Sequence, residues 1–70
     1  MAFAIEGIDH TGRIRREHTK PSEALATYIA WRQKADVINV RIFLYDGRRN
    51  EAISEIDLMR LSDSEKSSDA

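Results

Sequence analysis

The segment Val37–Tyr45 constrains the fold more than any other part of the chain. It is dense in β-branched and aromatic residues, which favour extended structure. Every second side chain in its middle is aliphatic, so an extended backbone would place four of them on one face: Ile38, Val40, Ile42 and Leu44. The sequence therefore predicts a central strand with an apolar face that another element must cover.

The segment before this strand, Pro21–Ala35, has the pattern of an amphipathic helix. Pro21 suits the first helical turn, where its missing N–H costs nothing, and Glu23 favours the positive end of the helix dipole. One helical face collects Leu25, Tyr28, Ile29, Arg32 and Ala35, with Ala24 and Trp31 on its flank. We expect the stem of Arg32 to pack on this face while its guanidinium reaches water or a carboxylate. The helix is predicted to cover the aliphatic face of the strand.

The N-terminal part of the chain predicts a β-hairpin. Phe3–Asp9 alternates as a half-buried strand, and a bulge at Gly7 would explain why the alternation changes phase there. Turn residues follow, and Arg13–His18 is predicted to return as a strand polar enough to be an edge.

The C-terminal part predicts a second hairpin and a second helix. Asp46-Gly47 is a turn signal, and Arg48–Ala52 is predicted to form a short return strand. Ser54 and Asp57 have the spacing of a capping box, so residues 54–61 predict a helix, with a strand over residues 53–61 as the alternative. Residues 62–70 are rich in Ser and Asp and are predicted to form a disordered tail.

Together these segments predict one small α+β domain over residues 1–61, in ββαββα order or in ββαβ order with a C-terminal helix. The expected architecture has two layers, a mainly antiparallel sheet with the Pro21–Ala35 helix packed on one face. The longest apolar run is too short to span a bilayer, and the N-terminus lacks the features of a signal peptide. We therefore expect no membrane association and a cytoplasmic location.

Catalytic and metal-binding chemistry find little support in the residues present. The chain has no cysteine, which excludes disulfides and thiolate metal sites. Its only histidines are His10 and His18, and a catalytic arrangement would have to combine one of them with Asp9 or Ser22. A zinc site needs three or four well-placed donors, which two histidines do not supply. No nucleophile motif or glycine-rich phosphate loop is present. We expect a protein that is not an enzyme and that holds neither a cofactor nor a metal.

A protein interface is the first functional hypothesis. Arg41, Phe43 and Tyr45 occupy the second face of the predicted central strand, and Trp31 lies on the flank of the predicted helix. Tyr, Trp and Arg are the residue types most enriched at interface hot spots. A second helix crossing behind the sheet would cover this face instead. If it does not, we expect a self-associating module, a homodimer of the kind found among small bacterial or phage accessory proteins.

Nucleic-acid binding, or mimicry of nucleic acid, is the alternative. Residues 1–50 carry nine Lys/Arg against six Asp/Glu, and residues 51–70 carry two against six, so the chain is basic first and acidic last. Four arginines, Arg13, Arg15, Arg16 and Arg48, would cluster if the two hairpin turns lay at the same end of the sheet. An edge strand protected by charge explains most of the same residues.

Overall fold

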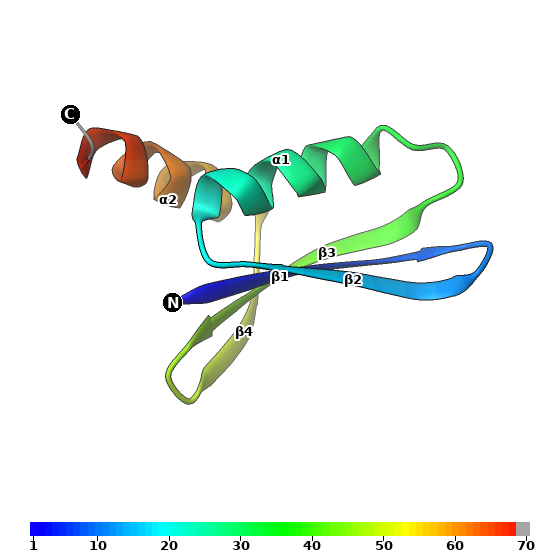
Figure 1. Cartoon of the computed structure of the whole chain (residues 1–70), viewed down its shortest axis with the longest axis horizontal. Helices are drawn as coiled ribbons and strands as arrows, with labels where there is room; N and C mark the ends of the chain where they lie inside the picture. Colours follow the sequence, from blue (N-terminus) through cyan, green and yellow to red (C-terminus); the bar gives the residue numbers. More distant parts are fainter. Residues whose placement is uncertain (69–70) are drawn as a thin grey trace.

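The computed structural model describes residues 1–68, and the side chains of residues 1–65. It confirms the predicted fold class: the elements follow one another in ββαββα order, and the four strands form one antiparallel sheet of order β2-β1-β3-β4 (Figure 1). The strands are β1 (Ala2–Asp9), β2 (Gly12–His18), β3 (Ile38–Asp46) and β4 (Arg49–Ile53). The helices are α1 (Pro21–Arg32) and α2 (Glu55–Ser68). β2 is an edge strand, as predicted, and β1 shares the centre of the sheet with β3.

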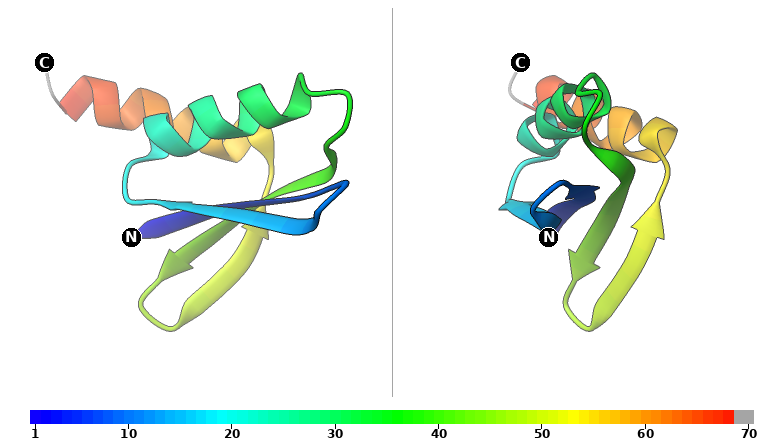
Figure 2. Two further views of the ribbon diagram at one scale, coloured as in Figure 1. Left: turned by 45° about the vertical axis from the view of Figure 1, so that its right-hand side comes forward. Right: turned by 90° about the vertical axis from the view of Figure 1, so that its right-hand side faces the viewer.

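Both helices lie on the same face of the sheet, and they run antiparallel to each other (Figure 2). Two contacts fix their register. Near the end of α1, Arg32 Nη1 lies 3.6 Å from Glu55 Oε2 at the start of α2. At the start of α1, the backbone N–H of Ser22 donates to Glu65 Oε2 at 3.1 Å. No element within residues 1–68 covers the opposite face of the sheet.

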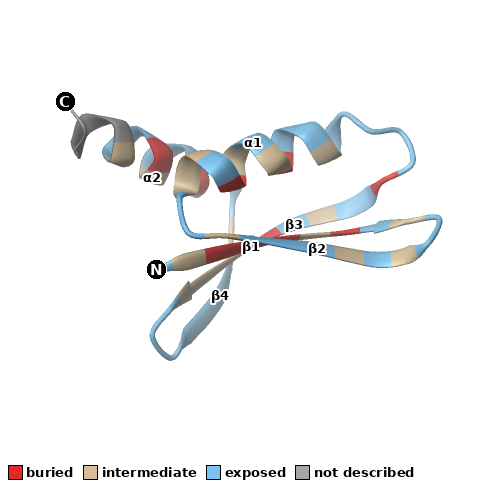
Figure 3. Cartoon of the chain, in the orientation of Figure 1, coloured by how far each residue is buried: buried red, intermediate tan, exposed pale blue. Residues whose placement is uncertain are grey.

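The core lies between the helices and the two inner strands (Figure 3). Its buried members are Phe3, Ile5, Ala24, Tyr28, Ile42 and Leu58. α1 contributes Ala24 and Tyr28, and the partly buried Trp31 extends the same stripe. The predicted stripe was rotated too far round the helix, because Ile29 is 41% exposed. The guanidinium of Arg32 finds the carboxylate expected for it, that of Glu55.

The start of β3 differs from the prediction by one residue. Two steps along β1, from Glu6 to Ile8, correspond to three steps along β3, from Arg41 to Ile38. The extra residue is therefore in β3, where Asn39 has a φ of 55°, and not at Gly7. The bulge reverses the parity predicted for Val37 and Ile38: Ile38 is 58% exposed, and Val37 is buried in its place.

Gly7 makes room for this arrangement opposite the bulge. A Cβ added to Gly7 would lie 3.0 Å from Val37 Cγ1 and 3.6 Å from Trp31 Cε3. The glycine in β1 is thus explained by the close approach of two large side chains in the helix layer.

α1 ends before, and α2 ends after, the residue predicted from the sequence. α1 stops at Arg32, and the backbone N–H of its cap residue Gln33 bonds Ile29 O at 3.2 Å. Residues 53–61 contain the start of a helix, capped as predicted: Asp57 N–H donates to Ser54 Oγ at 3.2 Å, and Ser54 N–H to Asp57 Oδ2 at 3.4 Å.

The tail predicted over residues 62–70 is wrong as far as Ser68, because α2 continues to that residue. Ser62 is only 2% exposed, and Glu65 receives the N–H of Ser22 at the start of α1. Small and polar residues thus serve as packing positions on this part of the helix, which has no apolar stripe. Residues 69–70 lie outside the described part.

Candidate functional site

The sheet face that no helix covers brings together charged and aromatic side chains from β1, β2 and β3. Strand pairing and the two-residue period of extended backbone assign its members. β2 contributes Arg13, Arg15 and Glu17; β1 contributes Ala2, Ala4, Glu6 and Ile8; β3 contributes Ile38, Arg41, Phe43 and Tyr45; β4 contributes Asn50 and Ala52. We call this set the uncovered face.

The two central strands differ in character on this face. Along β1 the side chains are small near the N-terminus and acidic in the middle, with Ala2 and Ala4 followed by Glu6. The β3 partners of these residues are large or basic, since Ala2 pairs with Tyr45, Ala4 with Phe43 and Glu6 with Arg41. On this face β1 therefore carries small and acidic side chains, and β3 carries large and basic ones.

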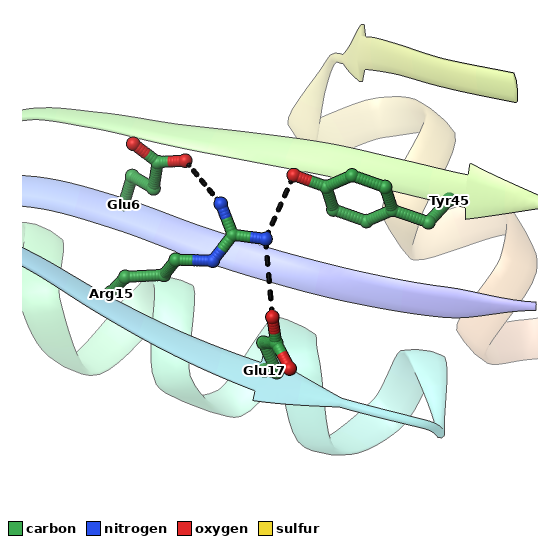
Figure 4. A network of polar contacts seen from close by, with 4 residues as sticks. All are labelled: Glu6, Arg15, Glu17 and Tyr45. Carbon is green, nitrogen blue, oxygen red and sulfur yellow. Dashed lines mark hydrogen bonds and ion pairs between the residues drawn. The ribbon is translucent and has the colours of Figure 1, made fainter.

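Arg15 ties three strands together on this face (Figure 4). Its Nη1 donates to Glu6 Oε2 at 2.9 Å, and its Nη2 donates to Tyr45 Oη at 2.8 Å and to Glu17 Oε1 at 3.2 Å. The guanidinium carbon lies 5.3 Å from the centre of the Tyr45 ring, within cation–π range. The hydrogen bond to Tyr45 raises the pKa of Arg15 above its ordinary value, because it favours the charged guanidinium. The network holds Tyr45 in a fixed position across β1.

A shallow hollow of about 330 Å³ lies beside this network, toward the β1–β2 turn. It is lined by Glu6, Gly7, Ile8, Arg13, Asn39, Arg41 and Phe43. Within the described residues, the side chains of Arg13 and Arg41 make no hydrogen bond and no ion pair. The hollow thus offers two unpaired guanidinium groups beside one aromatic ring.

Three of the four residues predicted for an interface come together on the uncovered face, namely Arg41, Phe43 and Tyr45. Trp31 does not join them, because it packs on the core in the helix layer, on the other side of the sheet. Sequence reasoning missed Ile8 and Ile38, which are 38% and 58% exposed and pair with each other at one end of the face. The signal that could have found them is the shift in parity that a bulge in β3 produces.

The four arginines of the nucleic-acid hypothesis are dispersed. The β1–β2 and β3–β4 turns lie at opposite ends of the sheet, so Arg48 is far from the other three (Figure 1). Arg13 and Arg15 point to the uncovered face, whereas Arg16 pairs with Ile5 and has the opposite parity. Arg15 is already engaged by two carboxylates.

The histidines do not form a catalytic arrangement. His10 Nδ1 lies 3.9 Å from Asp36 Oδ2 on an exposed loop, and His18 Nε2 lies 2.8 Å from Thr27 Oγ1. Asp9 bonds its own turn through Thr11, at the end of the hairpin away from His18. Among the residues described, no three His, Asp or Glu side chains gather as a metal site would require. No described helix has both the length and the apolar character needed to cross a membrane.

Comparisons with protein-family models, with curated proteins and with solved structures found no match.

Proposed function

We propose that this chain is a small, non-enzymatic protein-interaction module that associates with a second copy of itself through the uncovered face. The observation that carries the proposal is the position of α2. Because α2 lies beside α1, the side chains of Phe43 and Tyr45 have no covering layer within residues 1–68. A two-layer domain with large side chains on its bare sheet face gains stability when that face packs against another surface.

The surface area supports this proposal. The chain exposes 5030 Å². A compact monomer of its 8.0 kDa mass would expose about 4,450 Å². The excess fits a thin molecule whose shortest dimension is 16 Å. An apolar surface that stays in water costs about 25 cal/mol for each Å².

The dimensions of the face set the expected strength of association. Its thirteen side chains, each occupying about 4.8 by 6.7 Å of the sheet, cover roughly 420 Å². Two such faces bury on the order of 800–1,000 Å² in total, an area typical of weak interfaces. We therefore expect a dissociation constant in the micromolar range.

Analytical ultracentrifugation over about 1–500 μM tests the proposal. The unaltered chain should pass from monomer to dimer as its concentration rises. Phe43→Glu should remain monomeric, because dimerisation would bury an unpaired carboxylate. Ile56→Glu is the matched control, since Ile56 is 62% exposed on α2, away from the uncovered face. A monomer at every concentration, or a Phe43→Glu variant that sediments like the unaltered chain, would contradict the proposal.

Binding of single-stranded nucleic acid is a second candidate, and one observation favours it. Arg13 and Arg41 have no partner among the described residues and flank the hollow beside Phe43. Aromatic rings on an open sheet face stack bases, and guanidinium groups bind phosphate. Retention on a single-stranded oligonucleotide should then fall with salt and weaken in Arg13→Ala. Retention that is absent at low salt, or insensitive to salt, rules this candidate out.

A further inference from the structure

We infer that the two copies pack sheet to sheet about a two-fold axis parallel to the strands, between β1 and β3. The inference rests on the proposed self-association and deepens it by assigning which side chains meet. A symmetric interface must be complementary to itself, so each feature of the face needs its counterpart on the same face. The uncovered face meets this condition for one orientation of the axis.

Rotation about this axis lays β1 of one copy over β3 of the other and keeps each row of side chains in place. In the row that contains Glu6 and Arg41, Glu6 meets the partner's Arg41. Arg41 has no ion-pair partner within the described chain, and Glu6 uses only Oε2 for Arg15, so Oε1 can accept a second guanidinium. The rotation thus forms two equivalent ion pairs without breaking the Arg15 network.

The remaining rows match in size. The partner's large β3 side chains lie over the smallest β1 positions, with Ala4 opposite the partner's Phe43 and Ala2 opposite the partner's Tyr45. Ala4 is already fully buried within its own chain, so the partner's Phe43 rests on the side chains that cover it. At the far end, Ile8 meets the partner's Ile38, which covers the two exposed isoleucines together. Every row of the central strands therefore finds a complementary row.

An axis perpendicular to the strands matches the same residues less well. If this axis passes through the row of Glu6 and Arg41, Glu6 faces the partner's Glu6, and Arg41 faces the partner's Arg41. If this axis passes between that row and the row of Ala4 and Phe43, Glu6 faces the partner's Ala4 and gains no second guanidinium partner. Both arrangements leave charged groups opposed or unpaired at the centre of the interface, where unpaired charge is most costly. The parallel axis is preferred on this ground.

Complementary charge reversal tests the inference. Arg41→Glu alone would set Glu6 against an acidic side chain in both pairs, and Glu6→Arg alone would set two arginines together. Each variant should therefore dimerise at least about 100-fold more weakly than the unaltered chain. In an equal mixture, the unaltered Glu6 of the first variant faces the unaltered Arg41 of the second, and the two introduced side chains, one acidic and one basic, face each other. Native mass spectrometry, which separates the variants by mass, should show the mixed dimer and few homodimers.

A second experiment leaves in place the hydrogen bonds from Arg15 to Glu6 and Tyr45, the first of which Glu6→Arg removes. The chain contains no cysteine, so single cysteines can be placed at will. The parallel axis lays β2 over the partner's β4, and it brings Glu17 opposite the partner's Ala52, both of them exposed. A mixture of Glu17→Cys and Ala52→Cys chains should be joined by a short bismaleimide, and neither variant alone should be joined efficiently.

The outcomes distinguish a failure of self-association from a failure of the assigned axis. A monomeric unaltered chain overturns the proposed self-association and this inference with it. A chain that dimerises, but whose charge-reversed variants form no mixed dimer and whose cysteine variants join only with themselves, overturns the axis and leaves the proposed function standing. Mixed dimers together with mixed cross-links establish the assigned orientation.

Discussion

The place of α2 in the fold can be tested through Leu58, whose side chain is fully buried in the core cluster that also contains Phe3, Ile5 and Ile42. Leu58→Ala removes three buried carbon atoms and leaves a cavity, a change that costs about 2–5 kcal/mol in protein cores. A domain of this length has a free energy of unfolding of about 4–10 kcal/mol. The substitution should therefore remove a large share of the total stability and lower Tm by at least about 8 °C.

Met59 supplies the matched control because it is the next residue on the same helix and is 47% exposed. Met59→Ala should change the free energy of unfolding by less than about 1 kcal/mol. Urea unfolding followed by circular dichroism measures both variants, and it is best carried out in the Phe43→Glu background, so that association does not contribute. Equal and small effects at the two positions would refute the docking of α2 on the core, and with it the reason for leaving the other sheet face bare.

Two further predictions concern single residues. Asn39 has a φ of 55°, so Asn39→Val should lower the free energy of unfolding by about 1–2 kcal/mol and Asn39→Gly should not; equal urea midpoints for the two variants would argue against the left-handed bulge. Hydrogen bonds from the Thr11 side chain and backbone hold the pKa of Asp9 below its ordinary value of 3.8. The contribution of Asp9 to stability is thus complete at neutral pH and is lost as the pH falls through the lowered pKa. In an NMR titration, Thr11→Val should raise the pKa of Asp9, and an unchanged pKa would show that the turn hydrogen bonds do not hold the carboxylate.

The order of elements was predictable because local signals agree with the tertiary structure. Pro21 begins α1, the Ser54–Asp57 capping box begins α2, and glycine-containing turns separate the strands. The alternation from Val40 to Leu44 gave the correct face of β3, since no irregularity interrupts it. Each of these features depends on residues close together in the sequence.

The predictions were wrong where the local structure depends on contacts between residues distant in the sequence. The bulge at Asn39 is set by the fit of Val37 over Gly7, two residues that are neighbours only in the folded chain. The second half of α2 is held by the contact between Glu65 and the start of α1, which no pattern within residues 62–68 reveals. The candidate site was affected in the same way: Trp31 was placed on the flank of the helix, whereas it packs on the core beside Val37 and Gly7, and this rotation of α1 depends on contacts between distant residues.

The extra residue in β3 also governs how the molecule divides its apolar side chains between inside and outside. Before Asn39 the odd-numbered position, Val37, faces the core; after it, the even-numbered Val40 and Ile42 do. The chain thereby exposes Ile38 while Val37, Val40 and Ile42 still face the core. A strand that kept Asn39 in regular alternation would instead turn Ile38 toward the helices and Val37 toward the uncovered face, so this one extra residue decides which of the two side chains is exposed.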